Sequence, residues 1–133
     1  MREPSMMVAM ILSVVAFAGV VGAGAQAPAL KRTPLQKGDL SIAGHEAVQA
    51  MAEFPPGVSA GKHFHPGEEV SYVLEGALIL EIDGEAPRTI KAGEVFMVPA
   101  GKHHDAKNGA PGTTKVIATY IVEKGKPLAT PVP

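Results

Sequence analysis

From residue 47 onward, short apolar runs alternate with turn signals along the chain. Within several runs apolar and polar residues alternate, which is the period of a strand with one buried face. Each run ends at a turn that contains Gly or Pro. The runs predicted as strands are 47–54, 62–65, 70–74, 77–82, 88–91, 94–98 and 114–122. No longer stretch has a helical period, so the chain is predicted to be all-β, an antiparallel sandwich or barrel.

The composition supports one small β-rich domain. The chain has 133 residues, of which 46% are hydrophobic, enough to bury a single core. Fifteen Gly and twelve Pro supply turns. Twelve Lys and Arg against thirteen Asp and Glu leave no basic face that would indicate a nucleic-acid partner. Because cysteine is absent, disulfides, thiolate nucleophiles and Cys-ligated zinc are excluded.

The start of the chain has the pattern of a cleavable signal peptide. An uncharged run, 8–21, is followed by Gly22-Ala23-Gly24-Ala25, which fits the small-residue site of signal peptidase. We therefore predict residues 1–25 as a signal peptide and the mature protein as periplasmic or secreted, without a stable membrane anchor. Export without cysteines is typical of a bacterium. The alternative is an uncleaved anchor over 6–25, which the Gly and Ala residues at its end weaken.

The predicted mature chain divides into three parts. Residues 26–44 mix Pro, Lys and polar side chains and form a loose N-terminal arm or an edge strand. The barrel itself is predicted over 45–126. Residues 127–133 are rich in Pro and are predicted as a flexible tail.

Histidines and carboxylates gather at two turns. His63 and His65 are one residue apart on a predicted strand, so both side chains lie on one face and can bind one ion. The turn at Pro66-Gly67 is predicted to bring Glu68-Glu69 back alongside them as a hairpin. Farther along, His103-His104 follows another turn. The pattern indicates a metal site; the alternative is a set of ordinary surface histidines, and alternation does not choose between Glu68 and Glu69.

Two motifs in this region resemble those of the cupin superfamily. The first consists of Gly57, five residues, His63-Phe64-His65, three residues, Glu69, six residues and Gly76. The second consists of Gly93, five residues, Pro99-Ala100-Gly101, two residues, His104, three residues and Asn108. The sixteen residues between them match the compact spacing of small cupins. The chain thus resembles an exported, single-domain, quercetinase-like cupin of type 2, which implies a double-stranded β-helix, or jelly-roll barrel.

Carried over residue by residue, the resemblance implies that His63, His65, Glu69 and His104 bind one metal ion. The alternation of inward and outward residues supports this role for His104, which falls on the inward face of its strand. His103 falls on the outward face. The nitrogen and oxygen donors suit a divalent transition metal, namely Fe, Mn, Co, Ni, Cu or Zn. Four protein ligands leave positions for water, dioxygen or a small ligand.

Two functions are consistent with such a site. The first is a metal-dependent dioxygenase acting on a small phenolic or enol-type substrate, with Glu69 as the catalytic residue that accepts the substrate proton. The second is a non-catalytic module that contains the metal and binds or senses a small molecule. The resemblance also implies a homodimer.

The ligand class is predicted from the residues expected to line the pocket. These are mostly apolar and otherwise serve as core: Met51, Phe54, Val73, Ile82, Phe96 and Met97. The predicted mature chain has only two arginines, Arg32 and Arg88, which indicate no clamp for a carboxylate. We therefore expect a small apolar, phenolic or enol-type ligand.

Overall fold

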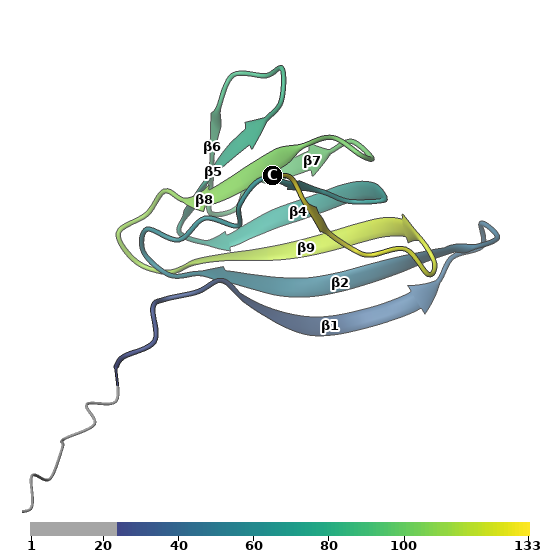
Figure 1. Ribbon diagram of the computed structural model, residues 1–133, viewed down its shortest axis with the longest axis horizontal. Helices are drawn as coiled ribbons and strands as arrows, with labels where there is room; N and C mark the ends of the chain where they lie inside the picture. The colour runs from purple at the N-terminus through teal and green to yellow at the C-terminus, as the bar shows by residue number, and fades with distance from the viewer. Residues whose placement is uncertain (1–23) are drawn as a thin grey trace, which may run out of the picture.

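The computed structural model describes residues 24–133, which form two facing antiparallel sheets of five strands each (Figure 1). The first sheet has the strand order β1-β2-β9-β4-β7 and the second β10-β3-β8-β5-β6. The strands are β1 (Lys31–Asp39), β2 (His45–Phe54), β3 (His63–Phe64), β4 (Gly67–Glu75), β5 (Ala77–Ile82), β6 (Arg88–Lys91), β7 (Val95–Val98), β8 (His104–Asn108), β9 (Thr114–Glu123) and β10 (Thr130–Pro131). The predicted all-β sandwich is confirmed.

The predicted signal peptide falls almost entirely on residues 1–23, which lie outside the described part of the chain. Within residues 24–133 there is no helix whose length and apolarity would let it cross a membrane.

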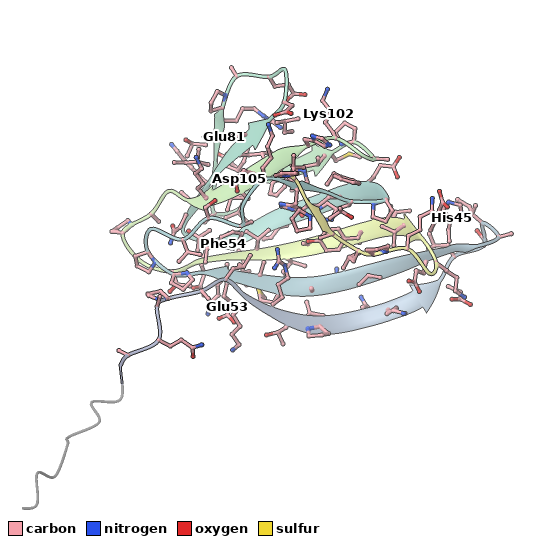
Figure 2. The ribbon with its side chains drawn as sticks, in the orientation of Figure 1. His45, Glu53, Phe54, Glu81, Lys102 and Asp105 are labelled. Atoms are coloured by element: carbon pink, nitrogen blue, oxygen red, sulfur yellow. The ribbon has the colours of Figure 1, made fainter. Side chains whose placement is uncertain are left out.

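The core lies between the sheets and follows the alternation of the strands. On β9 every second residue from Thr114 to Val122 is buried. On β2, Phe54 points between the sheets and is 4% exposed, whereas the neighbouring Glu53 lies on the opposite side of the strand (Figure 2). Because successive side chains of a strand point to opposite faces, this pattern was readable from the sequence.

The N-terminal arm is an edge strand. Residues 31–39 form β1, which pairs antiparallel with β2 and carries an irregularity between Pro34 and Gln36. Of the two possibilities for this arm, the structure shows the edge strand (Figure 1).

The C-terminal tail, which its composition predicted to be flexible, contains the two-residue strand β10. Thr130 and Pro131 pair with Phe64 and His63 of β3, and the Val132 amide donates to the Lys62 carbonyl at 2.9 Å. The tail has no alternating apolar pattern. Its order comes from backbone hydrogen bonds to a strand distant in sequence, which a local pattern does not reveal.

Two turns connect strands in the second half of the chain, one after β8 and one between β5 and β6. Asn108 forms an Asx turn, since its Oδ1 accepts from the Ala110 amide at 2.8 Å. An Asp-Gly pair is typical of two-residue hairpin turns, but Asp83-Gly84 does not form one. It begins a longer loop over 83–87 between β5 and β6.

Candidate metal centre

Three histidine rings converge between the sheets. His63 and His104 are direct register partners on β3 and β8, with ring centroids 4.3 Å apart. His65 follows β3, and its ring centroid lies 4.8 Å from that of His63 and 5.0 Å from that of His104. One nitrogen from each ring lies within 4.8 Å of the others. This upper limit is wider than the roughly 3.0–3.4 Å between neighbouring nitrogens that coordinate one ion at about 2.1 Å each.

The backbone holds each ring by its other nitrogen. The Nδ1 atoms lie at hydrogen-bonding distance from carbonyl oxygens: His63 from Gly61 at 2.6 Å, His65 from Leu128 at 2.7 Å and His104 from Lys102 at 2.9 Å. A carbonyl can only accept, so these contacts place the proton on Nδ1 and leave the Nε2 lone pair free for a metal. Leu128 belongs to the C-terminal tail, which therefore orients one of the three rings.

A carboxylate reaches the same point from the other sheet. Glu69 lies on β4 and is 7% exposed, and its Oε2 is 3.2 Å from the Nε2 of both His65 and His104. Its Oε1 accepts a hydrogen bond from Ser71 Oγ at 2.9 Å. The sequence predicted that the turn at Pro66-Gly67 folds Glu69 back onto the histidines as a hairpin. This prediction is wrong, because β3 and β4 belong to different sheets. Glu69 therefore meets the histidines across the interior and not along one ribbon.

The structure also separates the two neighbouring glutamates. Glu69 and Ser71 face inward, whereas Glu68 is exposed together with Val70 and Tyr72. Hydrophobicity alone would predict the opposite orientation of β4, because the more apolar face of this strand is the one exposed to solvent. The inward side of β4 is instead set by its register with β7 and β9, which places Glu69 opposite Val98 and Tyr120.

Electrostatics keeps the carboxylate charged. Burial by itself raises the pKa of Glu69, but the His104 and His65 rings outweigh it and lower the pKa to about 2. Burial lowers the pKa of His63. Burial also acts to lower the pKa of His104, but Glu69 and the Lys102 carbonyl outweigh it and raise that pKa. A charged carboxylate thus stands among buried imidazoles.

Two buried atoms at this point lack a hydrogen-bond partner. The Nε2 atoms of His65 and His104 are enclosed, and although each lies 3.2 Å from Glu69, neither is aligned as a hydrogen bond. An unpartnered buried polar atom costs about 1–3 kcal/mol. A transition metal coordinated by these nitrogens and the carboxylate would give both lone pairs a partner, so the residues fit such an ion.

A small cavity adjoins the cluster. Its volume is about 20 Å³, room for about one water molecule or an ion. Its apolar wall includes Ala52, Phe54, Leu80 and Phe96. Of the residues predicted to line a pocket, Phe54 and Phe96 do so.

The remaining predicted lining residues lie elsewhere. Val73 and Ile82 are buried in the core, and Met51 is half-buried. Met97 is 56% exposed on the outer face of the first sheet, so its prediction is wrong. It precedes Val98, which takes the inward position opposite Glu69.

Sequence reasoning missed two polar residues beside the cluster. Tyr120 is buried on β9, with its ring centroid 4.6 Å from that of His65. The alternation of β9 could have placed it inward. Arg32 lines the cavity from β1, although the two arginines of the predicted mature chain indicated no clamp for a carboxylate. No sequence pattern within the N-terminal arm predicts that Arg32 lies at the cavity.

The fold and this cluster define a class of protein: a β sandwich with a histidine and carboxylate centre between its sheets. A family model described as a cupin domain matches residues 50–122, and the chain belongs to the cupin family. An uncharacterised Klebsiella pneumoniae protein, described as having a double-stranded β-helix domain, superposes with a TM-score of 0.63 at 18% identity, over 79% of this chain and 88% of that one. The predicted jelly-roll fold is confirmed.

Two further proteins are similar in sequence as well. The oxalate-binding protein of Thermotoga maritima is 35% identical over 75 residues, covering 55% of this chain and 60% of that protein. The polyketide cyclase RemF of Streptomyces resistomycificus is 29% identical with a TM-score of 0.55, covering 65% of this chain and 60% of that one. The chain spans between 35% and 60% of the length of the curated relatives it matches.

Proposed function

We propose that this protein is a metal-binding cupin that holds one divalent transition metal through His63, His65, Glu69 and His104 and binds a small oxygen-donor ligand there. The observation that carries the proposal is the pair of enclosed, unpartnered Nε2 atoms beside a buried carboxylate. Fe, Mn, Co, Ni, Cu and Zn all suit three imidazoles and one carboxylate.

The metal would supply Lewis acidity and open coordination positions for the ligand. The chain supplies the rest. Backbone carbonyls orient the rings, Ser71 holds the Glu69 carboxylate, and the apolar wall limits water. Only about 20 Å³ is free beside the cluster, so the end of a ligand enters and a larger part stays outside.

Turnover is the second candidate function. A metal-dependent dioxygenase would use Glu69 to accept the substrate proton, and its Oε2 lies at the cluster where that proton would be released. Against this, both oxygens of the carboxylate are already engaged: Oε1 accepts a hydrogen bond from Ser71, and Oε2 lies 3.2 Å from the Nε2 atoms of His65 and His104. The geometry therefore favours a ligand role for Glu69 and a binding function for the protein.

Metal analysis of matched variants tests the proposal. We expect about one transition-metal ion per chain in the purified protein and in His103→Ala, and a loss of that ion in His104→Ala. His103 is a suitable control because it is adjacent in sequence but half-exposed and stacked on Phe64. Equal metal content in the two variants would refute the site. Oxygen uptake by the loaded protein with small phenols and enols separates a dioxygenase from a binding module.

We further propose a homodimer and export. Five exposed apolar residues cover neighbouring strands of the first sheet: Val70, Tyr72, Leu74, Val95 and Met97. Such a patch supports contact with a second copy. Export is supported by the pattern of residues 1–25, and mass spectrometry of the processed protein would then find Gln26 at its N-terminus.

A further inference from the structure

Among residues 24–133, Arg32 is the one permanently charged side chain that lines both the inner cavity and the groove outside it, and it is exposed to solvent. In the β1–β2 register it stands opposite Ala52, which is buried, so it shares the inward face of the first sheet. It lines the small cavity together with His63, Glu69 and His104. It also lines a groove of about 300 Å³ between β1 and the segment around β3 and β10.

Within the described residues, no carboxylate is paired with Arg32. None of the ten ion pairs there involves it. The only carboxylate in the cavity wall is Glu69, which faces Ser71 and two imidazoles. The groove has no acidic residue in its wall, and its other cation, Lys62, is paired with Asp83 at 2.7 Å.

The neighbour of Arg32 inside the cavity is a neutral hydroxyl. Tyr120 lines the same cavity as Arg32. Burial and the Glu69 charge raise the pKa of Tyr120, so its hydroxyl stays neutral. The rest of the cavity wall beside it is apolar, including Ala52, Ala118 and Val116. Arg32 itself is exposed to solvent, so its guanidinium lies at the mouth of this cavity. With no fixed anion beside it, it is available to pair with a planar anion.

We propose that Arg32 selects the ligand of the metal centre, and that this ligand is a small organic acid whose carboxylate pairs with the guanidinium while a second oxygen faces the histidine cluster. The proposal rests on the proposed function. A small organic acid takes the place of the apolar or phenolic ligand that the sequence predicted, because Arg32 lines both the groove and the cavity beside the centre. Small size follows from the two volumes: the inner space accepts only one end of a ligand, and the groove accepts the remainder.

The test compares an acid with its neutral analogue. Glycolate and glycolamide share a hydroxyl donor and nearly the same size, and only glycolate carries a negative charge. Calorimetric titration of the zinc-loaded protein should show that Arg32→Gln weakens glycolate binding by about tenfold or more, the effect of losing a charge-assisted contact. Glycolamide binding should change by less than about twofold.

Control variants isolate the charge and its place. Arg88→Gln removes the other arginine of the predicted mature chain, on β6 and outside both spaces, and should leave glycolate affinity unchanged. Arg32→Lys should restore part of the affinity because it returns the charge without the planar donor pair. Circular dichroism of each variant confirms that it is folded.

A second readout does not depend on the metal. In nitrogen-15 spectra of the protein, the Arg32 Nε signal should shift on glycolate addition, in the metal-free as well as the zinc-loaded form. The proposal is overturned if Arg32→Gln binds glycolate as tightly as the unaltered protein, or if inorganic phosphate binds as tightly as glycolate in an Arg32-dependent way. If zinc fails to bind while glycolate still shifts Arg32, the metal proposal fails and the carboxylate site stands.

Discussion

His63 and His104 stand directly opposite each other on β3 and β8, with ring centroids 4.3 Å apart, although they come from different motifs. Direct cross-strand partners have Cβ atoms about 4.5–5.5 Å apart, so backbone pairing alone brings the two imidazoles together. The Nδ1 contact of each ring with the carbonyl two residues before it then sets the ring orientation. Strand pairing and these carbonyl contacts therefore position both rings through the backbone.

Removing the metal should lower the thermal stability. A ligand that binds only the folded protein stabilises it by about 2.7 kcal/mol at a hundredfold excess over its Kd. We expect a chelator to lower the melting temperature in calorimetry and added zinc to restore it. The melting temperature of His104→Ala should respond to neither. An unchanged value for the unaltered protein with chelator would contradict a centre that stabilises the barrel.

Acid should release the metal before it removes the Glu69 contribution to stability. Imidazoles coordinate only when neutral, so we expect metal loss below about pH 5. The pKa of Glu69 is lowered from 4.5 to about 2, so its contribution is fully present above pH 4.5 and is lost as the pH falls towards 2.

Metal content and urea unfolding, measured across this range, separate the two steps. The stability difference between the metal-free protein and its Glu69→Gln variant should shrink as the pH falls from 4.5 to 2. A difference that grows on acidification would show that the sign is wrong.

Gly67 should not tolerate a side chain. It opens β4 after the crossing between the sheets, and a Cβ there would lie 1.8 Å from the Ile121 carbonyl oxygen. Gly67→Ala should destabilise the fold by about 3 kcal/mol or more, because backbone must move. Gly38→Ala on β1 meets nothing within 4 Å and should be nearly neutral. Urea unfolding of both variants checks this, and equal midpoints would contradict it.

Asn108 should act as a structural residue. Its Nδ2 donates to the carbonyls of Phe54 at 2.8 Å and Gly112 at 2.7 Å, while its Oδ1 accepts from the Ala110 amide. Asn108→Ala leaves these groups without partners and should cost about 2–3 kcal/mol in unfolding free energy. Gln36→Ala, which removes an exposed amide pair, should cost much less. Metal content per folded chain should be unaffected by either change.

The exposed patch on β4 and β7 should hold two copies together. Val95→Lys with Met97→Lys places charges in the patch and should convert a dimer to a monomer in light scattering. Ile42→Lys makes the same kind of change at a residue 59% exposed outside the patch and should leave the dimer intact. A monomeric mass for the unaltered protein would remove the proposed dimer.

Local alternation was sufficient to predict most strands, including β5 and β6 at their observed bounds, and the inward position of His104. These features depend only on which face of its own strand a residue occupies. The spacing of the two motifs indicated which histidines share a site. It did so through resemblance, since period two cannot tell which strands become neighbours.

Tertiary structure alone decided how those faces meet. It placed Glu69 across the interior from His65, turned the more apolar face of β4 outward, paired the tail with β3 and brought Arg32 to the cavity. Each of these depends on which distant strands pair and in what register. Pairing and register follow from the free energy of the whole closed sandwich, and no short stretch of this chain contains that information.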